Sequence, residues 1–307
     1  MNTHLTKTHL LVVGGTGFIG YHLVLYSKNK GWQVTSVSLN PPKKNRYVSG
    51  VNYLQVDISN SNNLKKKLVG SFTYVVNLGG YVNHSSFAQD GKNIIKVHFQ
   101  GLTNLVNILL KKKISKLVQI GSSLEYGNLK SPQKEENVEG LPKSPYSIAK
   151  LASTRFLLTL YKTKKFPSVI LRLFQVYGPR QDKNRILPQV INSCLKNKKF
   201  PVSTGNQIRD FCYIDDVINA ILLALESKKI KGEIFNIGSG KPLKIKQIIR
   251  QVCKKIGKGK PEYGKFKFRK DENMKIYPDI KKARIKLKWK PKVEFDSGIN
   301  SVINSYK

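Results

Sequence analysis

The chain has 307 residues, of which 55 are Lys or Arg and 18 are Asp or Glu, so its formal net charge is +37. Hydrophobic residues make up 40% of the chain and aromatic residues 9%, which is typical of a folded globular protein and excludes a disordered basic tail. No stretch approaches ~18 consecutive apolar residues, so the sequence predicts no membrane span. The length indicates two domains or one large α/β unit.

The positive charge raises the question of a nucleic-acid partner, because basic surfaces bind phosphate by releasing counterions. Most of the excess is Lys spread over the whole chain, and its densest run, 254–270, is interrupted by Gly, Pro, Glu and aromatic residues. Arg, the usual residue for reading bases, is scarce, and no known nucleic-acid-binding motif is present. We therefore predict no nucleic-acid partner and interpret most lysines as solvated surface.

The first residues, the cysteines and the histidines bear on location and on metal binding. Residues 1–9 lack the apolar core and the cleavage site of a signal peptide. Cys194, Cys212 and Cys253 are widely spaced and odd in number, which supports neither a disulfide framework nor a zinc site. The five histidines show no ligand spacing. The sequence predicts a cytoplasmic protein without a bound metal.

Apolar runs of strand length alternate with segments of helical periodicity through the first half of the chain. The expected strands are His9–Val13, Gln33–Leu39, Tyr53–Val56, Thr73–Leu78, Lys116–Ile120 and Ser168–Leu173. The expected helices are Phe18–Lys30 (ended by Gly31), Asn62–Val69, Asn93–Lys112 and Tyr146–Lys164. This alternation predicts an α/β fold with a doubly wound parallel sheet, the Rossmann arrangement.

The alternation loosens after about residue 176. Ile186–Lys196 and Asp215–Ser227 are helix candidates, whereas the C-terminal part of the chain shows shorter elements without a dominant period. We predict two parts with interleaved boundaries. They are a dinucleotide-binding domain over 1–175 plus about 207–236, and a smaller C-terminal substrate-binding lobe over about 176–206 and 237–307.

A glycine-rich loop follows the first expected strand. Gly14, Gly15, Gly17 and Gly20 fit both G-x-G-x-x-G and G-x-x-G-x-x-G. Such glycines let the backbone approach a pyrophosphate, and the helix that follows supplies free N–H groups and the positive end of its dipole. Because strand, loop and helix occur in the required order, we predict dinucleotide binding here. The predicted contact residues are Gly14, Thr16, Gly17, Phe18 and Ile19.

The choice between NAD and NADP depends on the end of the second strand, where an acidic residue normally binds the ribose 2′-OH of NAD. Ser38 stands in this region, which has no acid, and Lys43, Lys44 and Arg46 follow. A small residue with nearby cations accommodates a 2′-phosphate. In a chain this rich in lysine the cations are equally explained by composition, so the cofactor is NADP or NAD, with NADP favoured.

Three residues have the pattern of hydride transfer coupled to proton transfer. Ser122 follows the strand that ends at Ile120, and Tyr146 and Lys150 lie four apart on one helix face. A tyrosine with a pKa of about 10 is a weak base at neutral pH, and an adjacent ammonium favours its anion. The serine hydroxyl would hydrogen-bond the carbonyl or hydroxyl that is transformed. Y-x-x-x-K alone is more often a surface pair; its place after the loop and the serine makes it a catalytic candidate.

With these motifs in order, the chain resembles the extended short-chain dehydrogenase/reductases of the NAD-dependent epimerase/dehydratase family, which modify nucleotide-diphosphate sugars. The resemblance covers nearly the whole length. The motifs that carry it are Gly14–Gly20, Asp57–Ile58, Asn77–Gly80, Ser122 with Glu125–Gly127, Tyr146 with Lys150, Leu171–Arg180, Arg209–Val217 and Asn236–Gly240.

The resemblance implies a role for each matching residue. Tyr146 would be the acid and base, Lys150 its activator and ribose ligand, and Ser122 the hydroxyl partner. The cofactor would also be contacted by Ser38, Asp57, Ile58, Leu78, Gly79 and Gly80. The substrate would be contacted by Ser123, Gln175, Arg209 and Arg269. The two arginines would bind the diphosphate as bidentate donors; for Arg209, the alternative is a salt bridge to Asp210, Asp215 or Asp216.

Departures from the family pattern narrow the chemistry. Sugar 4,6-dehydratases of this family carry an acid directly after the catalytic Thr or Ser, where this chain has Ser123 and Leu124. Neither residue can serve as the acid or base of an elimination, and Glu125 points to the opposite side if the segment continues as a strand. A dehydratase is therefore disfavoured. Gln175 replaces a frequent Asn, which leaves the orientation of the substrate open.

Two enzyme hypotheses remain, and both act at C4 of a nucleotide-diphosphate sugar through Ser122, Tyr146 and Lys150. The favoured one, because Ser38 is not an acid, is an NADPH-dependent 4-keto-6-deoxyhexose reductase. The alternative is a 4-epimerase that retains NAD. A non-catalytic dinucleotide sensor on the same fold is a third hypothesis, disfavoured because Tyr146 and Lys150 are both present.

The resemblance also implies partners. Relatives dimerise through a four-helix bundle, and the matching helices here are 93–112 and 146–164, where Leu105, Ile108, Phe156 and Leu157 would form the contact face. Those positions would alternatively pack on the sheet. The expected partners are a nucleotide-diphosphate sugar and a second copy of the chain, in polysaccharide biosynthesis.

Overall fold

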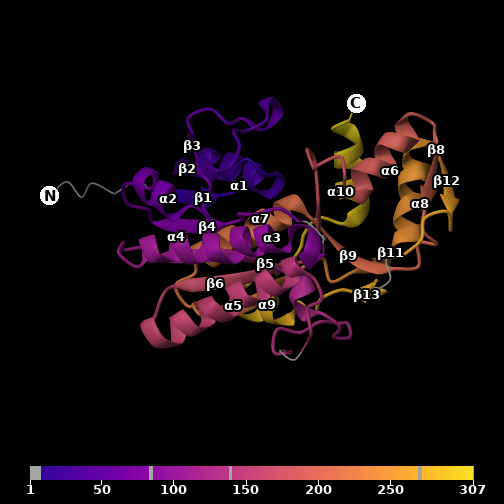
Figure 1. Ribbon diagram of the computed structural model, residues 1–307. Helices are drawn as coiled ribbons and strands as arrows, with labels where there is room; N and C mark the ends of the chain where they lie inside the picture. The colour runs from indigo at the N-terminus through magenta and orange to yellow at the C-terminus, as the bar shows by residue number, and fades with distance from the viewer. Residues whose placement is uncertain (1–7, 83–85, 138–139, 269–271, 307) are drawn as a thin grey trace.

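The computed structural model describes residues 8–82, 86–137, 140–268 and 272–306 (Figure 1). Its main element is a seven-stranded sheet in the order β10-β6-β5-β4-β1-β2-β3, in which every neighbouring pair is parallel. The strands are β1 (His9–Val13), β2 (Gln33–Ser38), β3 (Asn52–Gln55), β4 (Tyr74–Asn77), β5 (Lys116–Ser122), β6 (Ser168–Leu173) and β10 (Glu233–Ile237). The predicted doubly wound parallel sheet is confirmed. The six expected strands end within two residues of the predicted positions, and β10 was not among the expected strands.

Helices cover both faces of this sheet. The helices are α1 (Phe18–Asn29) and α7 (Ile214–Glu226), which pack together on one face, and α2 (Ser61–Lys67), α4 (Gly101–Leu109) and α5 (Pro145–Lys164) on the other. Leu10 and Val12 belong to the first core, and Leu11 and Val13 to the second. Because successive side chains of a strand point to opposite faces, a strand buried on both faces is apolar throughout.

The helical segment after β4 departs from a regular α-helix. It consists of η2 (Phe87–Gly91), α3 (Lys92–Ile95), η3 (Lys96–Gln100) and α4. Both η2 and η3 are π turns, so the segment starts six residues before the expected helix 93–112. π turns carry no simple sequence signal and often occur at functional sites. The second one places His98 against α5.

Most of the remaining elements form the C-terminal lobe, which Figure 1 shows at one end of the main sheet, whereas α9 (Lys281–Lys286) packs on β10 of the main sheet. A small sheet is built from β7 (Gln175–Tyr177), β9 (Ile208–Tyr213), β11 (Pro242–Lys244) and β13 (Lys275–Ile276). A separate pair joins β8 (Lys199–Val202) and β12 (Lys260–Tyr263). The helices of the lobe are α6 (Ile186–Leu195), α8 (Ile245–Ile256) and α10 (Phe295–Asn304). β10 belongs to the main sheet and β9 to the small one, and the division of the chain into two domains stays a prediction.

The expectation that the C-terminal part has no dominant period is wrong over α8. Ile245, Ile248, Ile249 and Val252 are buried at helical spacing, and α8 packs on α6. The basic residues between these positions hid the apolar stripe. The same packing brings the Sγ atoms of Cys194 and Cys253 within 3.4 Å, although 59 residues separate them, and both thiols are free.

The predicted dimer face is only partly at the surface. Leu105 and Leu157 are fully buried in the core beneath the sheet, so these two positions were wrongly assigned to a subunit contact. Ile108 and Phe156 are partly buried against the same core. Residues of α4 and α5 that face the sheet recur every three to four positions, and Leu105 and Leu157 are among them. Among the described residues, no helix is both long and apolar enough to cross a membrane.

Asp216, in the first turn of α7, anchors the C-terminal segment to the main domain. Its carboxylate accepts the backbone N–H groups of Lys292 (2.9 Å) and Val293 (3.0 Å), and its backbone carbonyl accepts Nε1–H of Trp289 at 2.9 Å. Asp216 is 4% exposed, so loss of its carboxylate strands two N–H groups away from water.

We expect Asp216→Ala to lower the free energy of unfolding by about 2–4 kcal/mol, because two buried donors lose their acceptor. The neighbouring Asp215→Ala is the matched control: it removes the same helix N-terminal charge from an exposed position and should cost less than about 1 kcal/mol. Chemical denaturation followed by circular dichroism measures both. Equal losses in the two variants would refute the anchor.

Candidate functional site

The glycine-rich loop connects β1 to α1, and three of its glycines are required by the packing of the protein itself. A Cβ on Gly14 (φ 83°) would lie 2.9 Å from the carbonyl oxygen of Leu78. A Cβ on Gly15 would collide with Ser36, and one on Gly20 would collide with the backbone of Gly14. The loop therefore holds β1, α1 and the end of β4 close together, as predicted from the motif.

Gly17 differs from the other three glycines. Its backbone angles, φ −73° and ψ 178°, suit any residue, and a Cβ there would have Gly14 O at 3.3 Å as its one neighbour within 4 Å. The N-cap of α1 makes no side-chain hydrogen bond, and the first turn has no acidic residue. These features leave N–H groups and the helix dipole available to an anion, which fits a bound pyrophosphate. Thr16, Phe18 and Ile19 complete this turn.

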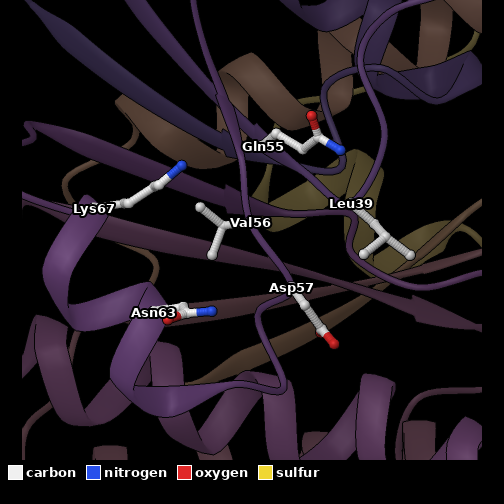
Figure 2. Close-up of a pocket in the computed structure, with 6 residues that line it drawn as sticks. All are labelled: Leu39, Gln55, Val56, Asp57, Asn63 and Lys67. Atoms are coloured by element: carbon white, nitrogen blue, oxygen red, sulfur yellow. The ribbon is translucent and has the colours of Figure 1, made fainter.

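A pocket of about 400 Å³ lies beyond the carboxyl ends of β2 and β3. Figure 2 shows Val56 and Asp57 between Leu39 on one side and Asn63 and Lys67, which project from α2, on the other. Asp57 accepts the backbone N–H of Ser59 at 2.8 Å. The predicted cofactor contact Asp57 thus lines a pocket. The predicted Ile58 is 7% exposed and packs inward against Gly79 and Gly101.

Ser38 and the loop after it occupy the position that would bind the ribose. Ser38 Oγ accepts the backbone N–H of Thr16 at 3.3 Å, which joins the end of β2 to the glycine-rich loop. The expectation that Arg46 serves as a free cation near a 2′-phosphate is wrong. Arg46 is 5% exposed and binds Asp182 (2.9 Å) and the carbonyl of Arg180, so the opposing carboxylate neutralises it. Lys43 Nζ lies 3.8 Å from the same Asp182 carboxylate, but its side chain remains 73% exposed.

The end of β4 lies beside the glycine-rich loop. Asn77 Oδ1 accepts the N–H of Gly79 at 3.0 Å, and Asn77 Nδ2 donates to Gln119 at 2.8 Å. Leu78 N–H donates to Val13 O at 2.9 Å. The structure therefore brings the predicted cofactor-lining residues Leu78, Gly79 and Gly80 next to Gly14, at the carboxyl edge of the sheet where ligands of this fold bind.

Ser122, Tyr146 and Lys150 meet at the carboxyl end of β5, as the sequence predicts. Tyr146 and Lys150 lie in the first turns of α5, where Ser144 caps the helix and Pro145 starts it. The Tyr146 hydroxyl is hydrogen-bonded to Ser122. Lys150 Nζ donates to Ile120 O at 2.8 Å and lies 5.8 Å from the centre of the Tyr146 ring. All three side chains are buried, each at most 8% exposed.

Burial dominates the acid-base properties of this pair. Desolvation, and to a lesser degree the charge of Glu125, raises the pKa of Tyr146 to about 12, against a lowering by Ser122 and Arg185. Desolvation lowers the pKa of Lys150 to about 8, against a raising by Glu125. In this arrangement the Lys150 ammonium is directed at Ile120 O and burial outweighs the groups that lower the phenol pKa, so a lowering by Lys150 stays a prediction. Tyr146 is held as a protonated phenol.

His98 is a residue of this site that the sequence did not reveal. Its ring lies edge-on to Tyr146, with centroids 4.9 Å apart. Nε2 donates to Tyr81 O at 2.9 Å, and Nδ1 is buried without a hydrogen-bond partner. Desolvation, and then the charge of Lys150, lowers the pKa of His98 to about 3, so the ring is neutral. A Cβ on Gly80 would collide with this imidazole.

Glu125 occupies a different place from the expected one. Residues Ser123–Tyr126 form a 3₁₀ turn, η4, and do not continue β5, so the carboxylate turns inward beneath Ser122. Ser122 and Glu125 form a capping box: the Ser122 side chain accepts the backbone N–H of Glu125, and the Glu125 side chain accepts that of Ser122. The S-x-x-E spacing was the sequence signal for this turn.

The model of the NAD dependent epimerase/dehydratase family matches residues 10–238. The chain belongs to this family. It is similar to the UDP-glucose 4-epimerase of Thermotoga maritima, solved with UDP-glucose, at 28% identity and a TM-score of 0.88, over 97% of this chain and 98% of that one. The UDP-glucose 4-epimerase of Thermus thermophilus, solved with NAD, is 26% identical with a TM-score of 0.87, over 97% of this chain and 99% of that one.

Family members with another reaction are also similar to this chain. The dTDP-D-glucose 4,6-dehydratase of Mus musculus is 26% identical over 97% of this chain and 88% of that protein. Membership of the epimerase/dehydratase family therefore fixes the class of enzyme, a nucleotide-sugar epimerase or dehydratase, and the site must distinguish the reactions.

The predicted substrate residues of this family member lie on two parts of the fold. Ser123 is buried in η4, and Gln175 is exposed on β7 opposite Phe211 of β9. Arg209, two residues before Phe211, is 7% exposed and pairs with Glu272. The alternative partners Asp210, Asp215 and Asp216 were wrong, because Asp210 and Asp216 bind backbone N–H groups and Asp215 is exposed. Arg269 lies outside the described residues, and the substrate contacts stay predictions.

A pair of variants separates the two kinds of glycine in the loop. Gly20→Ala should lower stability by about 1–3 kcal/mol, because its Cβ overlaps the Gly14 backbone. Gly17→Ala should change stability by less than about 0.5 kcal/mol and weaken NAD binding, because its Cβ would enter the space left for the pyrophosphate. Thermal unfolding and calorimetric titration with NAD measure the two effects. Unchanged NAD affinity in Gly17→Ala would exclude this loop as the phosphate site.

Proposed function

We propose that the protein is an NAD-dependent 4-epimerase of a nucleotide-diphosphate hexose, with a UDP-sugar as the first candidate substrate. The carrying observation is the buried contact between Ser122 and Tyr146 beside Lys150, with Ser123 and Leu124 where an eliminating enzyme needs an acid. The similarity to two UDP-glucose 4-epimerases supports the substrate class. Because neither Ser123 nor Leu124 is an acid, a 4,6-dehydratase is a poor fit, despite the similar mouse dehydratase.

The chain's residues divide the reaction at C4 between them. The glycine-rich loop would hold the pyrophosphate of NAD, and Asp57 with Leu39 would border its adenine. When bound, NAD would supply the acceptor for the hydride that leaves C4 of the sugar, and a positive charge that favours the Tyr146 anion. Tyr146 would take the proton from O4 as C4 is oxidised and return it when C4 is reduced. Ser122 would hydrogen-bond O4, and Lys150 would hold the cofactor ribose.

A reductase acting on a 4-keto-6-deoxyhexose is the second candidate. One observation favours it: β2 ends at Ser38, with no carboxylate to bind the 2′-OH of NAD, and Lys43 stands exposed close by in sequence. The protonated state of Tyr146 suits proton donation to a 4-keto oxygen, a step that both candidates require.

Identification of the cofactor retained by the purified protein separates the two candidates. An epimerase should hold NAD, interconvert UDP-glucose and UDP-galactose or the corresponding uronates, and consume no added nucleotide. Net oxidation of NADPH by a 4-keto-6-deoxyhexose substrate would reject the epimerase in favour of the reductase.

Replacing Tyr146 by Phe tests the catalytic assignment. The ring still packs against His98, so we expect the fold and NAD binding to persist, while kcat falls by roughly 10²–10⁴-fold because proton transfer at O4 is lost. Product formation under saturating nucleotide sugar measures kcat, and bound NAD is measured by absorbance after denaturation. Wild-type kcat in the variant would refute Tyr146 as the acid and base, whereas no turnover in the wild-type protein itself would favour the non-catalytic sensor.

A further inference from the structure

A buried carboxylate lies beneath the catalytic residues, and the reaction as described so far does not use it. The side chain of Glu125 is 0% exposed, and both of its oxygens are hydrogen-bonded. A charge that deep is costly unless it is fully paired, so its retention next to the site calls for an explanation.

The first oxygen fixes the residue that binds Tyr146. Glu125 Oε1 accepts the backbone N–H of Ser122 at 2.7 Å, and Ser122 Oγ accepts the N–H of Leu124 at 3.2 Å. A Cβ on Gly121 would collide with Oε1, so the strand has a glycine where the carboxylate passes. The position of Ser122 at the end of β5 is therefore set by Glu125.

The second oxygen connects the other two elements of the site. Glu125 Oε2 accepts the Thr154 hydroxyl at 2.8 Å and Nε–H of Arg172 at 2.9 Å. Thr154 lies four residues after Lys150 and eight after Tyr146, on the same face of α5. Arg172 belongs to β6 and stacks on the Tyr126 ring at 4.4 Å. One carboxylate thus ties β5, α5 and β6 together.

The charge of Glu125 also acts on both titrating residues. It raises the pKa of Tyr146 and that of Lys150, whereas burial raises the first and lowers the second. The other titratable or charged groups facing this pair come from the elements around it. They are His98 of η3 and Arg185 before α6, while Arg172 of β6, stacked on Tyr126 of η4, faces Glu125 itself.

We propose that Glu125 is a positioning residue of the C4 reaction: its carboxylate holds Ser122 at the end of β5 and ties it to the face of α5 that carries Tyr146 and Lys150. The expected changes in kcat rest on the proposed function, whereas the expected change in the titration of Lys150 does not. Glu125 acts through Ser122, Tyr146 and Lys150 and touches no reacting atom.

Two variants distinguish the effect of the Glu125 charge from the effect of its side-chain length. Glu125→Gln keeps the length and an acceptor oxygen but removes the charge, so the pH profile of kcat should move to lower pH by about one unit, because the pKa values of Tyr146 and Lys150 both fall. Glu125→Asp keeps the charge but cannot reach Ser122, Thr154 and Arg172 together. It should lower kcat by roughly 10-fold or more with the profile in place.

A matched control addresses general damage from removing a buried carboxylate. Glu135 is 6% exposed and accepts the backbone N–H of Asn236 at 2.8 Å, away from the catalytic residues. Glu135→Gln should lower stability without moving the pH profile. If Glu125→Gln alone fails to fold because Arg172 is left unpaired, the double variant Glu125→Gln/Arg172→Met removes both charges and should show the same shift.

A readout without substrate keeps this proposal distinct from the proposed function. Carbon-13 NMR of labelled lysine follows the titration of Lys150, with the signal assigned by Lys150→Met. Its midpoint should fall in Glu125→Gln and stay in Glu135→Gln. An unchanged midpoint in folded Glu125→Gln would overturn the role of Glu125. If the wild-type protein epimerises no nucleotide sugar while the midpoint moves, the proposed reaction fails and the role of Glu125 stands.

Discussion

The parallel pairing of the central sheet is the constraint on which the site depends. Because all seven strands run the same way, their carboxyl ends meet at one edge, and each strand releases its chain there into a loop. The register sets Val13 beside Asn77, and Asn77 beside Gln119. The glycine-rich loop, the turn at Gly79 and the strand end at Ser122 therefore converge, although more than 100 residues separate the first from the last. α5 then needs only to place one face over this edge.

Burial raises the pKa of Tyr146 and lowers that of Lys150, and the carboxylate of Glu125 acts on both values. Desolvation favours the neutral forms of both Tyr146 and Lys150. A neutral phenol is useful as a proton donor, whereas a neutral amine would remove the cation that the cofactor ribose requires. A negative charge beneath the pair opposes the loss of the ammonium and reinforces the protonated phenol. Arg172 in turn balances the carboxylate, so the charges form a closed group away from water.

The fold and the meeting of Ser122, Tyr146 and Lys150 were predictable from sequence because their signals are local. Strand ends, the glycine spacing, Ser122 and the Tyr146–Lys150 spacing each lie within a short window whose chemistry allows few residue types. The supporting residues depend on geometry that no window contains. His98 faces Tyr146 through a π turn, and Arg46 meets Asp182 across 136 residues. For Glu125, the S-x-x-E spacing indicates the turn that is found. The expectation of a strand continuing past Ser122 placed its carboxylate on the opposite face of the sheet.

The scarcity of acids gives the net charge of +37 a structural meaning. Among the described residues, four acidic side chains are buried, namely Glu125, Glu135, Asp210 and Asp216, and each accepts at least one backbone N–H group. An acid in such a position cannot be replaced by lysine, which donates only, without stranding those N–H groups. Exposed acids carry no such requirement. The four buried acids therefore mark places where the chain needs a carboxylate, and one of them, Glu125, lies directly beneath Ser122.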